Sequence, residues 1–190
     1  EGHSWIFGGL DYDPSRPRAE HFKHDLRVLM ENEEGAFEDS GLKLPGQRRA
    51  FAGTRVGDRY YMIGGMRDGF QLVESCEYFD FSRGEFGEFT CPPRARLSGQ
   101  AVEVNGKIYL IGGSSRGDDG KLHADTSLEV FDPETNTWSR LHPQLPIEGR
   151  HLRAFDYKGR LLLVNAHSED PELKILLVDV QEQRAIPADS

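Results

Sequence analysis

The chain of 190 residues is long enough for one domain with a sizeable core, and its charged residues (29%) give a formal net charge of −9. This charge argues against a general nucleic-acid-binding protein, which needs a basic surface to release counterions. No apolar run reaches the roughly 20 residues that span a bilayer. Eleven Phe, six Tyr and two Trp argue against disorder. The two cysteines define no disulfide framework and leave the compartment unknown.

From the N-terminus on, one pattern recurs four times: a tight turn, an apolar strand and a pair of small residues. The pairs begin at Gly8, Gly64, Gly112 and Asn165, which are 56, 48 and 53 residues apart. A second mark follows the same period of about 50 residues, which indicates a repeat protein. This mark is an apolar residue followed, after six intervening positions, by an aromatic one in the first three copies. Its pairs are Met30 and Phe37, Phe79 and Phe86, Phe131 and Trp138, and Val178 and Ala185.

The third copy carries a specific family signature. Its segment 128–138 reads Leu-Glu-Val-Phe-Asp-Pro-Glu-Thr-Asn-Thr-Trp and follows the Gly pair at 112–113, and it resembles the kelch repeat. The resemblance covers nearly the whole chain and is degenerate in the fourth copy. It implies an all-β fold, a kelch-type β-propeller in which each repeat forms a four-stranded blade around a central channel. In chain order, the blades are expected at about 1–44, 45–92, 93–145 and 146–190.

Within the third copy, the pattern predicts where the strands begin and end. Gly106 marks a tight turn between the first two strands, and the Gly pair ends the second strand where backbones crowd together. The aromatic residues of the second mark are expected to be buried between blades: Phe37, Phe86 and Trp138. The four strands of the copy are expected near 99–104, 107–113, 127–132 and 137–141.

The first copy starts at the turn that follows a blade's innermost strand. We therefore expect about four blades, three complete and one without its innermost strand, as part of a larger propeller. The open blade faces would then be covered by the remainder of the propeller or by a second copy of the chain. The alternative is a closed ring of four blades that lacks one strand.

Arginines precede the innermost strand of three copies at similar distances from the next turn. On one interpretation they form an arc at the channel mouth and bind the carboxylates of a partner. The segment 93–99 supports this interpretation, because it is similar to the stretch in kelch substrate adaptors whose arginines hold acidic peptide motifs. On the other interpretation, local carboxylates and carbonyls hold the arginines as part of the scaffold. The candidate residues are Arg48, Arg49, Arg96, Arg150 and Arg153.

Other polar residues give weaker signals, and no catalytic residue, metal site or cofactor is assigned. His21 and His24 are expected to face apart, and His123, Asp119 and Asp125 are interpreted as exposed loop residues. The Arg-Gly-Asp at 116–118 is treated as a chance match. Both cysteines, Cys76 and Cys91, are interpreted as packing residues rather than a disulfide bridge.

Two classes of function follow from these observations. The preferred one is a propeller that binds a protein or peptide with an acidic motif, with no nucleic acid and no membrane involved. The alternative is a kelch-type sugar mutarotase or epimerase, or another carbohydrate-active propeller, for which Glu148 and His151 would be the acid and base. A copper oxidase would need Tyr, His and Cys ligands that the sequence does not bring together.

Overall fold

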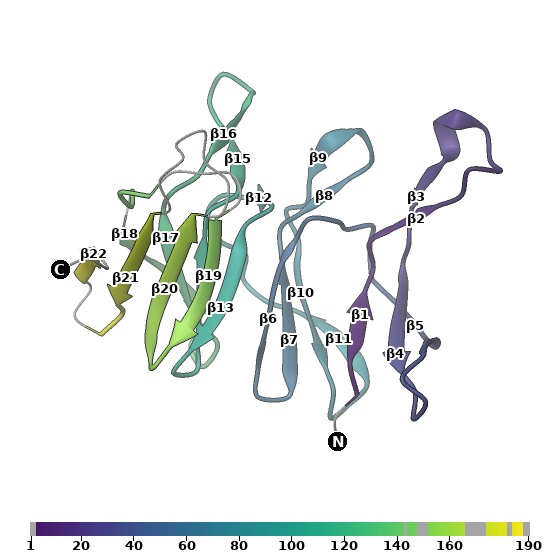
Figure 1. The fold of residues 1–190 in the computed structure, drawn as a ribbon, viewed down its shortest axis with the longest axis horizontal. Helices are drawn as coiled ribbons and strands as arrows, with labels where there is room; N and C mark the ends of the chain where they lie inside the picture. Colours follow the sequence, from purple (N-terminus) through teal and green to yellow (C-terminus); the bar gives the residue numbers. More distant parts are fainter. Residues whose placement is uncertain (1–2, 143, 148–151, 166–173, 182–183, 188–190) are drawn as a thin grey trace.

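The computed structural model describes residues 3–142, 144–147, 152–165, 174–181 and 184–187. Within these ranges the chain forms antiparallel sheets and two single 3-10 turns, η1 (Arg18–Glu20) and η2 (Asp68–Phe70). Four sheets stand side by side in chain order (Figure 1). The all-β kelch-type propeller fold predicted from the repeats is confirmed.

The second, third and fourth sheets have four strands each, and the first has three described strands. In each sheet the strands follow one another from the inner edge outward, and the inner strands of neighbouring sheets lie next to each other. The first sheet contains β1 (Trp5–Phe7), β4 (Arg27–Glu31) and β5 (Phe37–Lys43), and the second contains β6 (Ala52–Val56), β7 (Arg59–Ile63), β10 (Cys76–Asp80) and β11 (Glu85–Glu88). The third contains β13 (Gln100–Val104), β14 (Lys107–Ile111), β17 (Leu128–Asp132) and β18 (Thr137–His142), and the fourth contains β19 (Leu152–Tyr157), β20 (Arg160–Asn165), β21 (Ile175–Asp179) and β22 (Arg184–Pro187).

Between the second and third motif strands of the first three copies, the chain extends into a β-ribbon. All three ribbons project from the same end of the molecule, at the top of Figure 1. The first pairs β2 (Leu10–Tyr12) with β3 (Phe22–His24), and the second pairs β8 (Met66–Arg67) with β9 (Gln71–Leu72). The third joins β12 (Arg96–Leu97), β15 (Ser114–Arg116) and β16 (Leu122–Ala124). We call this end of the molecule the ribbon end.

The third sheet follows its sequence prediction closely. Its four strands lie within about two residues of the expected ranges. Asn105 and Gly106 both have positive φ, 53° and 80°, as a two-residue hairpin turn between β13 and β14 requires. Close approach of backbone segments also explains the Gly pairs. A Cβ on Gly64 would lie 2.2 Å from the Arg96 carbonyl oxygen, so only glycine lets the two backbones approach this closely.

Three apolar clusters fill the space between neighbouring sheets, and together they form the core. Each cluster takes residues from two adjacent sheets, because the alternating side chains of each strand point to its two neighbours in turn. The half-buried rings of Phe86 and Trp138 pack in this way, with centroids 5.0 Å from Phe79 and 5.1 Å from Phe131. These two aromatic residues therefore lie between blades, as predicted.

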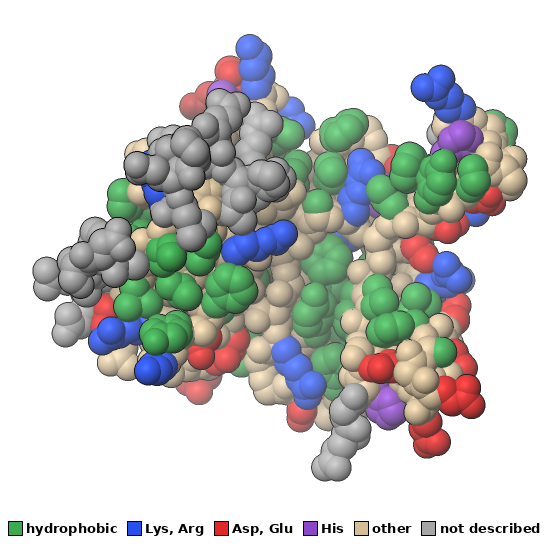
Figure 2. Space-filling model, viewed as in Figure 1, with side chains coloured by type: hydrophobic (Ala, Val, Ile, Leu, Met, Phe, Trp, Pro, Cys, Tyr) green, Lys and Arg blue, Asp and Glu red, His purple; other side chains and the backbone are tan. Residues whose placement is uncertain are grey.

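The prediction that Phe37 is buried between blades is wrong, because 44% of this residue is exposed. Phe37 pairs with Glu31 on the face of the first sheet that points away from the second sheet, and Ile6 is exposed on the same face. Figure 2 shows apolar side chains gathered over this sheet and over the ribbon above it. Phe37 has the position of an interblade aromatic, but no described residue packs over it.

The interpretation of the two cysteines as separate packing residues is also wrong. Cys76 on β10 and Cys91 in the connection after β11 form a disulfide, with their Cα atoms 5.4 Å apart. This separation is ordinary for a disulfide. The connection folds back over β10 on its way to the next sheet, and this tertiary path brings together two residues that are 15 positions apart.

Candidate functional site

Arg48 and Arg96 occupy equivalent buried positions, with 3% and 1% of each residue exposed. Arg48 forms an ion pair with Glu77 on β10 and donates hydrogen bonds to the carbonyl oxygens of Gly64 and Ser75. Arg96 forms the corresponding ion pair with Glu129 on β17. Each guanidinium thus ties the segment entering a blade to the third strand of that blade. For these two residues the structure supports the scaffold interpretation that the sequence left open.

Local electrostatics agree with a structural role. Burial lowers the pKa of Arg48, and the nearby charge of Glu77 opposes that shift. Arg96 Nη1 lies 3.6 Å from Asp125 Oδ1. Burial raises the pKa of Asp125, but the charge of Arg96 and hydrogen bonds from Ser127 and Ser115 outweigh it, so the pKa falls below its usual value. Buried charges of this kind persist only when they are paired, and here the partners are internal.

The buried arginines differ from Arg49 by one residue in their distance from the next hairpin turn. Arg48 and Arg96 lie ten residues before the turn residues Asp58 and Gly106, whereas Arg49 lies nine before. Successive side chains of an extended segment point to opposite sides, and Arg49 is accordingly half-buried, with its guanidinium 5.6 Å from the Phe70 ring.

The remaining two predicted arginines do not add to one described site. Arg150 also lies nine residues before its turn residue, Gly159, but it is outside the described residues. Arg153 is exposed on β19 of the fourth sheet. The structure thus buries two of the five candidates and leaves Arg49 and Arg153 at least partly accessible.

The sequence did contain a signal for the buried pairs. Glu77 and Glu129 each stand two residues before the buried aromatic of the third strand, Phe79 or Phe131. In the fourth copy the same register position, paired with β20, is Leu176. A carboxylate that recurs with an arginine and disappears from a degenerate copy indicates an internal ion pair.

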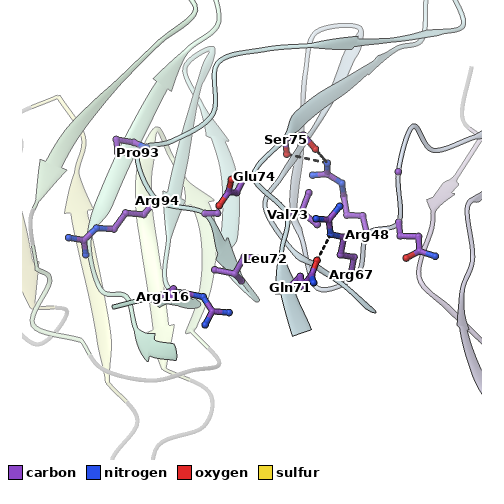
Figure 3. A pocket seen from close by; sticks show the side chains of 13 residues that line it. Arg48, Arg67, Gln71, Leu72, Val73, Glu74, Ser75, Pro93, Arg94 and Arg116 are labelled. Carbon is purple, nitrogen blue, oxygen red and sulfur yellow. Dashed lines mark hydrogen bonds between the residues drawn. The ribbon is translucent and has the colours of Figure 1, made fainter. Parts of the chain in front are cut away.

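A cleft of about 900 Å³ opens at the ribbon end, between the second and third sheets. Three exposed arginines contribute to its lining: Arg67 from β8, Arg94 from the connection before β12, and Arg116 from β15. Arg94 belongs to the segment 93–99 that the sequence singled out, whereas Arg67 and Arg116 were not expected in a site. Figure 3 shows Arg94 and Arg116 on one side and Arg67 and Arg48 on the other, with Leu72 and Val73 between them. The other lining residues are Gly46, Gln47, Gln71, Glu74, Ser75, Pro93 and Ala95.

The cleft is locally positive on an acidic chain. Glu74 is the single carboxylate among the residues that line it. Arg67 Nε donates to Gln71 and Arg116 Nη1 to the Gly120 carbonyl, which leaves further N–H groups of both guanidiniums available. Arg94 forms no ion pair with any described residue. This arrangement can bind carboxylates beside the apolar strip that Leu72 and Val73 form.

The other polar candidates do not assemble into a site within the described part of the chain. The buried His24 imidazole lies 2.9 Å from Asp68, and His123 contacts Asp119 at the exposed end of a ribbon. No group of three or more His, Cys, Asp or Glu side chains in these residues is arranged to hold a metal ion. Glu148 and His151 lie outside the described residues. No described helix is long and apolar enough to cross a membrane.

Comparison with known proteins points to kelch-repeat proteins. The kelch motif model matches residues 95–143. Kelch repeat and BTB domain-containing protein 12 of Danio rerio is 26% identical over 136 residues, which is 68% of this chain and 22% of that protein. Kelch-like protein terF of Aspergillus terreus is 31% identical over 117 residues, 60% of this chain and 25% of that protein.

The kelch motif match and these kelch-repeat relatives support a kelch-repeat family. Its match spans about a quarter of the length of these two curated kelch relatives. The solved structure of YjhT matches with a TM-score of 0.62 and 15% identity over 76% of this chain and 52% of that one. That likeness supports the kelch-propeller fold and carries no information about the ligand.

Proposed function

We propose that this kelch propeller binds a protein or peptide with an acidic motif in the cleft between the second and third sheets. Kelch-repeat propellers commonly bind proteins. The observation that carries the finer proposal is the placement of Arg67, Arg94 and Arg116 around one apolar strip. Guanidinium groups bind carboxylates through two parallel hydrogen bonds, which fixes orientation as well as charge.

The three arginines come from three separate segments, so they can contact successive acidic side chains of one ligand. A single exposed ion pair contributes only about 0.2–1 kcal/mol. Useful affinity therefore requires several carboxylates at once, together with apolar contact to Leu72 and Val73. A peptide in which acidic residues alternate with an apolar one fits these requirements. Its binding should weaken as salt screens the charges.

The buried arginines support the site without touching the ligand in this proposal. Arg48 lines the cleft but is paired with Glu77. Arg96, on β12 of the third ribbon, is buried beside Glu129 and Asp125. Arg49 lies beside Phe70 at the neighbouring ribbon and is within reach of a longer partner. We therefore move the proposed contacts from the buried arginines to the exposed ones.

Fluorescence anisotropy with labelled peptides tests the proposal. The probes are a peptide alternating Glu with Leu and its isosteric partner alternating Gln with Leu. We expect the acidic peptide to bind, and Arg94→Ala with Arg116→Ala to weaken it by about tenfold, since two exposed pairs are lost. Arg83→Ala is the matched control, because Arg83 is an exposed arginine of the β10–β11 turn outside the cleft. Equal binding of both peptides, or equal loss in the control, would contradict the proposal.

A further inference from the structure

The connections that lead from one sheet to the next are anchored in two different ways. In the first, the Leu44 amide donates to the Leu26 carbonyl at 2.8 Å. In the third, the Leu145 amide donates to the Thr126 carbonyl at 3.0 Å. Both leucines are buried, and each is followed by proline. One backbone hydrogen bond and one buried side chain thus hold each of these connections against its sheet.

The second connection cannot make this bond. Pro92 stands where the leucines stand, because it is buried, precedes a proline and lies four residues before Arg96, just as Leu44 lies four before Arg48. Proline has no backbone N–H to donate. The carbonyl of Glu74, the counterpart of Leu26, is instead approached by Cys91 Sγ at 2.8 Å. The disulfide to Cys76 stands in the place of the missing hydrogen bond.

This connection also carries part of the proposed binding site. Pro93, Arg94 and Ala95 follow Cys91 by two to four residues and line the arginine cleft. The two cysteines line an adjoining cavity of about 340 Å³, which shares four lining residues with the cleft, Val73, Glu74, Pro93 and Ala95. Cys91 is half-buried, whereas Cys76 is buried. A small reductant can therefore approach the disulfide from the cavity, on the Cys91 side.

We propose that the Cys76–Cys91 disulfide is a reversible redox site that fixes the position of Arg94; its effect on affinity rests on the function proposed above. A dithiol supplies the chemistry. One of its thiolates attacks Cys91 Sγ, the S–S bond breaks, and Cys76 leaves as a thiolate that takes up a proton. The second thiol then displaces Cys91, so two electrons and two protons pass to the protein and the dithiol becomes a disulfide.

Reduction removes the one covalent anchor of a connection that lacks the backbone anchor. A Cys91 thiol can donate to the Glu74 carbonyl, but a thiol is a weak donor. The bonds around Thr90, to Asn136 and from Trp138, hold the connection upstream of Cys91. Downstream it is next held at Arg96, by the pairing of β12 with β15 and by the hydrogen bond from the Gly65 amide to the Arg96 carbonyl. Among the described residues, only the disulfide holds the stretch between these two anchors. Arg94 should therefore become more mobile in the reduced protein, while the neighbouring connections keep their hydrogen bonds.

Hydrogen exchange, measured without any ligand, tests whether the disulfide holds this connection in place. We compare the oxidised protein with protein reduced by dithiothreitol, after alkylation and mass measurement have confirmed the thiol state. The amides of residues 94 and 95 should exchange about five- to tenfold faster after reduction, the size expected for losing roughly one anchoring bond. Residues 44–48 serve as the internal control and should not change. Unchanged exchange at 94–95, or free thiols before reduction, would overturn the proposal.

Pro92→Leu supplies the decisive variant, because it restores the amide and the leucine of the other two connections. Reduction should then leave exchange at 94–95 unaltered, whereas Cys91→Ala, which can form neither the disulfide nor a hydrogen bond to Glu74, should show the fast exchange in both buffers. Pro92→Ala replaces the leucine variant if the larger side chain destabilises the protein. If amide exchange in the Pro92 variants still became faster on reduction, the disulfide would not be a replacement for the missing hydrogen bond.

The acidic Glu-Leu peptide then separates the two proposals. Its affinity should fall by about five- to tenfold on reduction of the wild type and remain constant in Pro92→Leu. Faster exchange with unchanged affinity would overturn the effect on Arg94. Absence of peptide binding in either redox state would count against the proposed function. The exchange data would still decide whether the disulfide holds the connection in place.

Discussion

Phe37 in the first sheet and Phe86 in the second hold the same place in their repeats, yet Phe37 is exposed and Phe86 is half-buried. Both lie on the strand that pairs with the third motif strand, and both point toward the position of a preceding blade. For Phe86 that position is filled by the first sheet, whose Trp5 and Phe7 join the same apolar cluster. The position in the repeat therefore decides which way a side chain points, whereas the neighbouring blade decides whether that side chain is buried.

Removing an aromatic ring from between the first two sheets should lower stability far more than removing Phe37 from the exposed face. Phe79→Ala removes a ring with 2% exposure from the cluster between the first two sheets. It should lower the free energy of unfolding by about 3–5 kcal/mol. Phe37→Ala should change it by less than about 0.5 kcal/mol, as for a surface substitution. Urea unfolding measures both, and similar losses in the two variants would mean that the first sheet's outer face is covered.

The glycines allow a second comparison at smaller magnitude. Gly64 and Gly84 have nearly the same φ, 64° and 69°, but only at Gly64 would a Cβ collide with backbone. Gly84→Ala should cost about 1–2 kcal/mol for the left-handed conformation alone. Gly64→Ala should cost more, because the Arg96 carbonyl must also move. Equal thermal shifts in the two variants would show that the backbones between blades are not in close contact.

The second and third sheets carry an aspartate at the matching place, Asp80 and Asp132, and different groups lower the pKa of each. Hydrogen bonding from Ser82, with help from Arg59, lowers the pKa of Asp80 to about 2 from its ordinary 3.8, whereas Asp132 at the matching place depends first on Lys107. A carboxyl with a lowered folded-state pKa stabilises the protein above its unfolded pKa, and this contribution is lost as the pH falls from about 4 to about 2. Asp80→Asn should flatten the pH dependence of the urea midpoint in that range. An unchanged acid limb would contradict the Asp80 assignment.

Local patterns predicted the fold well because every blade repeats the same local requirements. The turn at Gly106, the Gly pair at 112–113 and the alternation in 128–138 each depend on neighbours in sequence, and they are where the pattern placed them. The burial of Phe37 and the Cys76–Cys91 disulfide depend on segments that meet only in the folded chain. No repeat signal contained that information.

The candidate site was predicted in part, and for a similar reason. The sequence pointed to the arginines before each inner strand. It did not distinguish arginines that lie nine residues before the next turn from those that lie ten before it. In the folded chain that single residue reverses the side chain, which buries Arg48 and Arg96 beside Glu77 and Glu129. The exposed Arg67 and Arg116 lie on ribbons whose association at one end becomes visible only in three dimensions.

Charge reversal at exposed and buried arginines tests whether the exposed arginines bind a partner and the buried ones hold the blades together. Arg94→Glu with Arg116→Glu should abolish anisotropy binding of the acidic peptide and leave the melting temperature nearly unchanged, since both side chains are exposed. Arg96→Glu should instead lower the melting temperature sharply, because it buries a carboxylate beside Glu129 and Asp125. Undiminished peptide binding by the stable double variant would contradict the account.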